Sequence, residues 1–323
     1  MDFLHSLICM AGTDYTKQRA GRALRHAYDG PFWRRLAIGG VQRIPLPLKF
    51  ATMPLWGGIF HALVGDARHT AQKNLARVLG PVGSVELLSR TQRLFTNYAQ
   101  SIANLFALYQ DLPLGIDVVT HRGDLLEGMQ REGRGGVLVT GHMGYWQIAP
   151  FLMAQKAYAP LTMAMAEEPN QRTAEFEEKF RARLRIVYTT RSPLALVELA
   201  RIVNKGELVG MQMDRHTGGA HLMVDFFGKP AAFPTGPTML ARATRSPLIP
   251  VFVIASRDRK RCEFFVEEPI IVSHTRDRDG DVADATRKLV AIYERYVARY
   301  PEQWFNFFDF WAPPPRVATR ARG

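Results

Sequence analysis

A short apolar run, Val137–Thr140, is followed directly by Gly141 and His142, and this junction constrains the fold more than any other stretch. The run follows the glycine-rich segment 133–136 and is entirely apolar or β-branched, which is typical of a strand buried in the middle of a parallel sheet. A histidine at the carboxyl end of such a strand lies where open α/β sheets place their chemistry. A lone histidine also has a plain structural interpretation, as a buried ring bonded to a loop carbonyl.

Strand-like and helix-like segments alternate along the chain from residue 118 to residue 300. This alternation favours an α/β fold with a mostly parallel, twisted sheet flanked by helices. The predicted strands are 118–120, 137–140, 161–165, 186–188, 207–213, 223–227, 248–255 and 262–266. The predicted helices are 146–156, 173–185, 193–204, 236–244 and 283–300. We therefore expect an α/β core over residues 111–312, followed by a disordered basic tail over 313–323.

The first 110 residues are expected to form a mainly helical region. Apolar residues recur at helical spacing in 66–79, and a second helix is predicted for 84–109. The apolar stretch 50–64 is about five residues shorter than a membrane span, which needs roughly 20 residues. With the basic residues before it, the region around 32–64 fits an amphipathic anchor in a membrane interface, and a helix buried in the fold explains it equally well.

Charge and cysteine content restrict the partners and the compartment. The chain has 323 residues and a formal net charge of +12, a balance that attracts nucleic acid, anionic lipid headgroups or an acidic protein. Its two cysteines, Cys9 and Cys262, lack the spacing of a disulfide framework or a zinc site, which favours a reducing cytoplasm. Asp2 stands where a secretory signal has a basic residue, so no secretory signal is predicted.

Three further segments of the core carry residues suited to chemistry. Asp214 and Arg215 follow a predicted buried strand, so they lie beside the histidine if the two strands are neighbours. Thr235 and Gly236 open a predicted helix whose free N–H groups favour an anion. The third segment, 246–252, is a buried strand bracketed by prolines. Each also has an ordinary explanation, as a turn, a capped helix or a core strand.

Taken in order, these segments resemble the motif blocks of the glycerolipid-type acyltransferases, and within that superfamily the bacterial lipid A late acyltransferases. Gly-His-Met-Gly-Tyr-Trp at 141–146 resembles that family's Gly-His-x-Gly-Asn-Trp. Val-Asp-Phe-Phe-Gly at 224–228 and Pro-Glu-Gln-Trp at 301–304 resemble its Phe-Phe-Gly and Pro-Glu-Gln-Trp segments. The resemblance covers roughly residues 65–312 and indicates the family more strongly than the substrate.

The sequence departs from the family's His-x4-acid block at one position. Five residues after the histidine the family carries Glu or Asp, and this chain has Gln147. An acid there holds the imidazole in one tautomer and stabilises its positive charge, whereas an amide supplies only hydrogen bonds. Relatives carry a second acid in the block that Asp214 matches. We therefore expect Asp214 to be the acidic partner of His142 and Gln147 to orient the ring.

The resemblance implies an acyltransferase in which His142 removes a proton from an acceptor hydroxyl or amine as that atom attacks an acyl thioester. The donor is then acyl carrier protein or coenzyme A, and neither a metal nor a further cofactor is expected. Arg215 or backbone N–H groups would stabilise the oxyanion. Catalytic roles fall to His142, Asp214 and Gln147, and further substrate contacts to Gly144, Tyr145, Trp146, Thr235, Gly236, Arg172 and Arg183.

Several of these residues have equally ordinary roles. Arg172 and Arg183 lie on or beside a charged helix and fit a solvated face. Phe226 and Phe227, like the methionines near the motif blocks, would line an acyl tunnel or fill the core, and periodicity does not separate the two.

Three classes of function remain. The first is transfer of a long acyl chain to a lipid-like acceptor on the inner face of the plasma membrane, with acyl carrier protein and an anionic membrane surface as partners. The second is a catalytically weakened, lipid-binding relative, which Gln147 suggests. The third, a nucleic-acid binder, rests on charge alone, and the basic residues are spread rather than clustered, so no nucleic-acid partner is expected. Aminolipids, glycolipids and carrier-bound polyenes are all compatible acceptors, and the acyl chain length and oligomeric state stay open.

Overall fold

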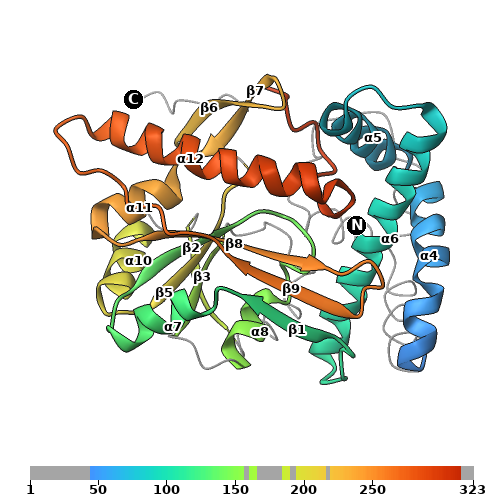
Figure 1. Ribbon diagram of the computed structural model, residues 1–323, viewed down its shortest axis with the longest axis horizontal. Coiled ribbons are helices and arrows are strands. Elements are labelled where there is room, and N and C mark those ends of the chain that lie inside the picture. The colour runs from blue at the N-terminus through green and yellow to red at the C-terminus, as the bar shows by residue number, and fades with distance from the viewer. Residues whose placement is uncertain (1–43, 156–159, 166–183, 190–193, 216–218, 314–323) are drawn as a thin grey trace, which may run out of the picture.

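The computed structural model describes residues 44–155, 160–165, 184–189, 194–215 and 219–313. Its centre is a seven-stranded sheet in the order β1-β9-β8-β2-β5-β3-β4, flanked by helices (Figure 1). Within this sheet all neighbouring strands pair in parallel except β8 and β9. The strands are β1 (Asp117–His121), β2 (Gly136–Thr140), β3 (Leu161–Met165), β4 (Arg185–Tyr188), β5 (Leu208–Gln212), β8 (Leu248–Ala255) and β9 (Arg261–Val266).

The other elements cover and extend this sheet. Two strands, β6 (His221–Phe226) and β7 (Lys229–Pro234), form a separate antiparallel hairpin. The helices are α4 (Leu46–Leu63), α5 (Gly65–Leu79), α6 (Ser84–Tyr109), α7 (Asp124–Arg131), α8 (Ala149–Gln155), α10 (Ala195–Asn204), α11 (Gly236–Thr244) and α12 (Arg278–Arg299), with a short 3-10 helix, η2 (Pro301–Gln303).

Both faces of the sheet are buried at its central strands, and β2 shows how the sequence produces this. Val137 and Val139 pack into a cluster with residues of α10, α11 and α12. Leu138 points to the opposite face and packs with residues of α6, α7 and α8. Because successive side chains of a strand point to opposite faces, a continuous apolar run is what a central, doubly covered strand needs. The predicted α/β class is therefore confirmed.

The helices α4 and α6 lie side by side at one end of the molecule (Figure 1). Gly57 permits this close approach, because a Cβ atom at that position would lie 2.5 Å from the Cα atom of Thr96. The opposite side of α4 carries exposed apolar residues: Leu48, Leu55, Trp56, Ile59 and Leu63. In the described part of the predicted anchor region, α4 is thus buried on the side that packs against α6 and exposed on the opposite side. Within the described ranges, no helix has the length and apolarity to cross a membrane.

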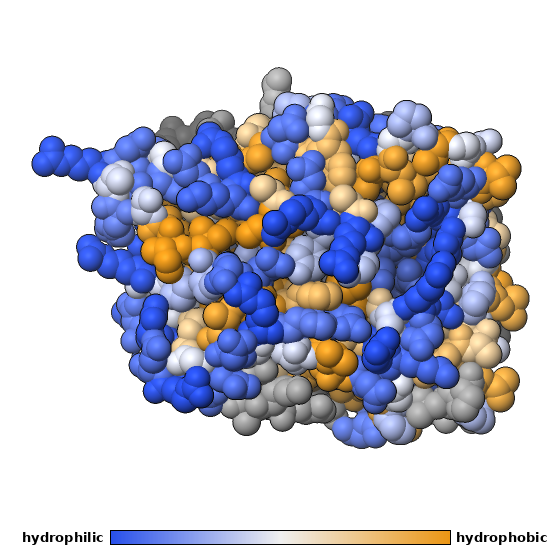
Figure 2. Space-filling model, viewed as in Figure 1, coloured by the Kyte–Doolittle hydropathy of each residue, from blue (hydrophilic) through white to orange (hydrophobic). Residues whose placement is uncertain are grey.

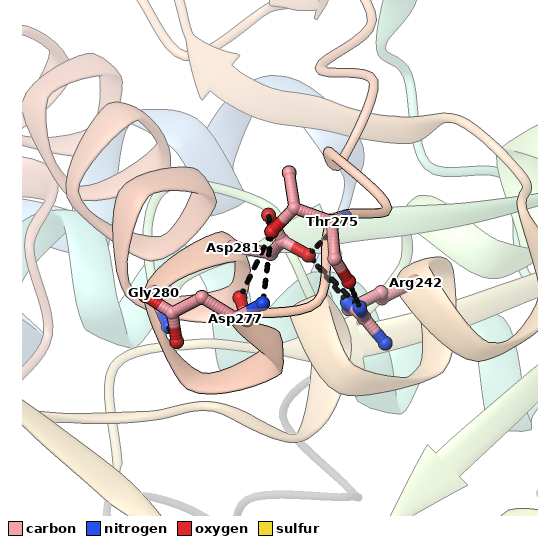
Figure 3. Close-up of polar contacts among 5 residues, drawn as sticks. All are labelled: Arg242, Thr275, Asp277, Gly280 and Asp281. Carbon is pink, nitrogen blue, oxygen red and sulfur yellow. Dashed lines mark hydrogen bonds and ion pairs between the residues drawn. The ribbon is translucent and has the colours of Figure 1, made fainter.

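The start of α12 is fixed by a polar network (Figure 3). The Asp277 side chain caps the helix by accepting from the Gly280 N–H at 2.9 Å. Asp281 forms a buried ion pair with Arg242 of α11 at 2.9 Å and accepts from both the N–H and the hydroxyl of Thr275. These contacts hold α12 against α11, and α12 carries a tyrosine that enters the site described below.

Most predicted elements are present, and four predictions need correction. The segment 146–156 begins as a turn, and its helix starts only at Ala149. Strand 223–227 belongs to the separate hairpin, and its partner β7 was not predicted because its Lys-Pro start does not read as a strand. The short helix α7 was also not predicted, and the closing helix begins at Arg278 rather than residue 283. A charged helix was predicted for 173–185, but Arg185 begins β4. Residues 173–183 of that predicted helix lie outside the described residues. Residues 314–323, most of the predicted tail, also lie outside them.

Candidate active site

Two glycines shape the loop that carries His142. A Cβ atom on Gly141 would lie 2.3 Å from the ring of Tyr293, and one on Gly144 would lie 2.0 Å from the carbonyl oxygen of Val253. Gly144 also has a φ of +54°, a left-handed conformation that favours glycine. The loop after β2 therefore passes between α12 and β8 with no room for side chains at these two positions.

The structure places Asp214 directly against His142. The strands β2 and β5 are neighbours, and the Met213 N–H donates to the Thr140 carbonyl just beyond their register. Both side chains thus leave the sheet at the same edge. The Nδ1 atom of His142 lies 2.6 Å from Oδ1 of Asp214, and the main-chain N–H of His142 donates to Oδ2 at 2.8 Å. Both side chains are buried.

Two residues from the last part of the chain complete the shell around Asp214. The Tyr293 hydroxyl donates to Oδ2 at 2.6 Å, and the Asn306 amide donates to the same oxygen at 3.2 Å. With the two contacts from His142, the carboxylate receives four hydrogen bonds. A buried carboxylate needs such donors to stay charged.

This surrounding sets the charge of both groups. Burial by itself raises the pKa of Asp214. The charge and the hydrogen bond of the neighbouring imidazole lower this pKa by more than burial raises it. The pKa of Asp214 therefore lies below its usual range, helped by Arg215 and Tyr293. Burial and the positive charge of Arg215 lower the pKa of His142 to about 4, against the opposing effect of Asp214. At neutral pH the pair is an aspartate anion beside a neutral imidazole.

The hydrogen bond fixes the tautomer of that imidazole. Because Nδ1 faces a carboxylate, we assign the ring proton to Nδ1, which leaves Nε2 with a free lone pair. A neutral imidazole held in this way can accept a proton at Nε2, and Asp214 can stabilise the imidazolium that forms.

Trp146 packs beside the His142 ring, and Phe305 packs against Trp146. The indole of Trp146 lies 5.4 Å from the His142 ring, centroid to centroid, and 5.6 Å from Phe305. The Phe305 N–H donates to the His142 carbonyl at 2.9 Å. Trp146, predicted as a substrate contact, thus packs directly against the imidazole.

Arg215 lies beside the pair but faces the C-terminal segment. Its Nη2 atom donates to the Phe305 carbonyl at 3.1 Å, and its Nε atom lies 3.4 Å from the side-chain oxygen of Asn306. Because Asn306 itself donates to Asp214, Arg215 supports the same shell as well as adding positive charge near His142.

The segment after α12 was not assigned a role by sequence reasoning, although its Pro-Glu-Gln-Trp motif was a usable signal. Gln303 accepts from the Gly144 N–H at 2.9 Å, and its amide side chain bonds both backbone groups of Ala255. Trp304 forms a backbone bridge with Met143. This segment therefore clamps the histidine loop against β8.

The remaining predicted residues lie at different places. Gln147 is buried in the turn before α8, and Tyr145 is buried with its hydroxyl donating to the Arg259 carbonyl at 2.9 Å. Thr235 and Gly236 begin α11, and among the described residues no hydrogen bond joins either of them to His142 or Asp214. Arg172 and Arg183 lie outside the described residues.

The Phe-Phe-Gly segment supports the site indirectly. Phe227 and Gly228 have φ values of 52° and 70°, which makes them the two-residue turn of the β6–β7 hairpin. Phe226 is fully buried and stacks on the Tyr293 ring at 5.8 Å. Phe226 therefore fills the core and positions the tyrosine that donates to Asp214. Among the described residues, no cluster of three or more His, Cys, Asp or Glu side chains could hold a metal.

A mostly parallel α/β sheet with a buried His–Asp pair at the carboxyl edge of its central strand has the arrangement used for general-base chemistry. Residues 33–312 match the bacterial lipid A biosynthesis acyltransferase family, so the chain belongs to that family. It is an acyltransferase, as the resemblance implied.

Two mycobacterial relatives are similar over most of their length. A phosphatidylinositol mannoside acyltransferase of Mycobacterium tuberculosis (strain H37Rv) is 26% identical over 264 residues, which cover 78% of this chain and 79% of the relative. The protein of that name from Mycolicibacterium smegmatis is 26% identical over 286 residues, covering 86% and 90%. The crystal structure of the 1-acyl-sn-glycerophosphate acyltransferase of Thermotoga maritima aligns with a TM-score of 0.38 and 16% identity, over 80% of this chain and 99% of that one.

Proposed function

We propose that this acyltransferase uses His142 as a general base to move a long acyl chain from a thioester to a hydroxyl group of a glycolipid-like acceptor. The observation that carries the proposal is the 2.6 Å contact between Nδ1 of His142 and Oδ1 of Asp214. That contact leaves Nε2 as the proton acceptor and supplies the negative charge that Gln147 does not.

In the proposed reaction the acceptor O–H gives its proton to Nε2 of His142 as the oxygen attacks the thioester carbonyl. An ester C–O bond forms, the C–S bond breaks, and the imidazolium returns the proton to the leaving thiolate. Asp214 stabilises the positive charge on the ring while it lasts. An amine acceptor would follow the same proton path and give an amide.

The donor and the acceptor are inferred from different features. A thioester on acyl carrier protein or coenzyme A suits a chain with a net charge of +12, because both donors are anionic. A glycosylated phospholipid is the proposed acceptor because the two mycobacterial relatives are named phosphatidylinositol mannoside acyltransferases.

Thiol release from acyl thioesters tests the reaction. We expect wild-type protein to release thiol in the presence of a glycolipid acceptor and His142→Ala to fall to background. A lipid-binding relative without turnover would instead bind the acyl chain and release no thiol in either form. Gln147→Glu refines the result: a faster variant shows that the amide weakens the site, and a slower one shows that the site is built around the amide.

We also propose that α4 places the enzyme on the inner face of the plasma membrane. Its exposed residues Leu48, Leu55, Trp56, Ile59 and Leu63 follow one stripe of the helix, and Figure 2 shows hydrophobic side chains at this edge of the molecule. An apolar stripe on a basic protein suits an anionic lipid surface.

Flotation with phosphatidylglycerol vesicles tests this membrane proposal. Flotation should be weakened by Leu55→Ser/Ile59→Ser and unaffected by Leu194→Ser/Val197→Ser, which alters exposed apolar residues outside α4. Equal flotation of the two double variants would contradict the assignment.

A further inference from the structure

A cavity of about 590 Å³ has neither His142 nor Asp214 in its lining, and most of its charged lining residues are arginines. Two come from α6, two from the loop between β8 and β9, and one from the end of α12: Arg90, Arg93, Arg257, Arg259 and Arg299. Figure 2 shows mostly hydrophilic side chains over this part of the molecule, where α6, α12 and the β8–β9 hairpin converge in Figure 1. Its volume is in the range of small-ligand sites.

The lining carries more positive charge than its own acids neutralise. Its five arginines face two glutamates, which leaves a net charge of +3. Both acids already have partners, because Glu302 binds Arg90 at 2.7 Å and Glu263 binds His121 at 2.6 Å. Like charges gathered around a cavity repel one another, so an anionic ligand would stabilise this arrangement.

Several guanidinium groups have donors to spare. Among the described residues, neither Arg93, Arg257 nor Arg299 forms an ion pair with a carboxylate. Arg93 donates to the Ser89 hydroxyl at 3.5 Å, and the Arg299 guanidinium lies over the Tyr300 ring. The Nε atom of Arg259 is buried and has no hydrogen-bond acceptor within the described part of the chain. Unused guanidinium donors on one cavity are suited to the oxygens of a phosphate group.

The cavity shares its walls with the histidine loop. Gln303 and Ala255 line the cavity, and Gln303 also accepts from the Gly144 N–H. Tyr145, three residues after His142, donates to the carbonyl of Arg259. A ligand held in the cavity therefore lies beside the loop that carries the proposed base.

From these contacts we infer that the cavity binds a phosphate-bearing part of one of the transferase's substrates. The inference rests on the proposed function, because it assigns to the cavity the charged end of a molecule whose reactive end lies at His142. The acceptor headgroup and the nucleotide of a coenzyme A donor share this phosphate chemistry. A guanidinium group can bind the phosphate of either molecule with two parallel hydrogen bonds.

Binding to the full chain, measured by calorimetry at low ionic strength, tests the inference without turnover. One arm uses glycerophosphoinositol, as the acceptor headgroup, and the other uses adenosine 3′,5′-bisphosphate, as the donor nucleotide. Inositol and adenosine are the uncharged counterparts. The variant Arg93→Gln/Arg257→Gln removes two exposed arginines of the cavity, and Arg201→Gln/Arg278→Gln removes two exposed arginines outside it.

We expect one phosphorylated probe to bind in preference to its uncharged counterpart and to identify the source of the phosphate. The cavity variant should weaken that binding about ten-fold or more, as is usual for lost charged hydrogen bonds, and the outside variant should not. In turnover assays the cavity variant should raise KM with little change in kcat, because it affects binding rather than the reacting atoms. Binding of neither probe, or equal loss in both variants, would overturn the inference. Phosphate binding in a protein without thioester turnover would instead reject the proposed function and leave the cavity assignment standing.

Discussion

The hydroxyl of Tyr293 donates to Oδ2 of Asp214 at 2.6 Å, while the other carboxylate oxygen of Asp214 faces His142. Burial, reinforced by the negative charge of Asp214, raises the pKa of Tyr293 well above its ordinary value, so the phenol keeps its proton and remains a donor. A helix more than 60 residues beyond β5 thus fixes the orientation of the acid beside the proposed base.

Tyr293→Phe should therefore reduce kcat without unfolding the protein. We expect a loss of about ten-fold, because one hydrogen bond to a charged group is removed while the ring and its packing stay. Tyr296→Phe is the matched control, since that hydroxyl lies on the same helix and donates to Glu267 instead. Steady-state rates of thiol release measure the effect, and equal losses in both variants would indicate a general weakening of α12.

Asp214→Asn should cost far more than any change at Gln147. An amide at position 214 keeps the shape but supplies no charge and can favour the wrong tautomer, for which a loss of roughly 10³–10⁴-fold is expected. The double variant Asp214→Asn/Gln147→Glu asks whether an acid at the family's usual position can replace the missing charge. Partial recovery of kcat would show that both positions reach the same imidazole. If Asp214→Asn alone kept full activity, the proposed role of the pair would be wrong.

The pH dependence of kcat/KM should have an unusually low acid limb. The base must be neutral to accept a proton, and burial with Arg215 lowers the pKa of His142 to about 4. Activity should therefore persist below the ordinary histidine pKa of about 6.5 and fall only as the pH approaches about 4. Arg215→Gln should move this limb to higher pH, because it removes a charge that opposes protonation. Circular dichroism at each pH separates this effect from acid unfolding.

Sequence reasoning succeeded where the relevant pattern is local. The apolar run at 137–140 predicted a central strand, and the Gly-His junction after it predicted where His142 lies. The proximity of Asp214 to His142 required one further assumption, that the two buried strands before these residues are neighbours in the sheet. The pairing of β2 with β5 meets that assumption. Topology of this kind is readable because parallel strands end at the same edge of a sheet.

The donors that surround Asp214 were not predictable in the same way. Tyr293 lies within an ordinary amphipathic helix. Asn306 follows the Pro-Glu-Gln-Trp motif, which does not predict where the Asn306 side chain points. Their roles arise from the packing of α12 and the segment after it on the sheet. Sequence periodicity indicates which face of a helix is buried, but it does not indicate which buried hydroxyl meets which carboxylate.

Gly144→Ala should destabilise the fold and the site together. The substitution adds left-handed strain, typically about 1–2 kcal/mol, and places a methyl group 2.0 Å from the Val253 carbonyl, so the loop must move. Gly133→Ala is the control for strain alone, because its φ is +62° and nothing lies within 4 Å of the added atom. Denaturant unfolding should show a clearly larger loss for Gly144→Ala. Equal losses would mean that contact with β8 does not restrict the loop.

The packing of α4 on α6 can be tested with two adjacent glycines. At Gly57 an added Cβ would lie 2.5 Å from the backbone of Thr96, so Gly57→Ala should separate the helices and cost about 1–3 kcal/mol. At Gly58 the nearest atom is the flexible Gln92 side chain at 3.6 Å, so Gly58→Ala should stabilise α4 by up to about 1 kcal/mol through helix propensity. Both substitutions replace glycine by alanine at neighbouring positions of one helix. Changes of opposite sign in the free energy of unfolding are therefore expected only if α6 lies against Gly57. Stabilisation by both would place α4 farther from α6, and its apolar stripe would then no longer be held in the orientation that the membrane proposal requires.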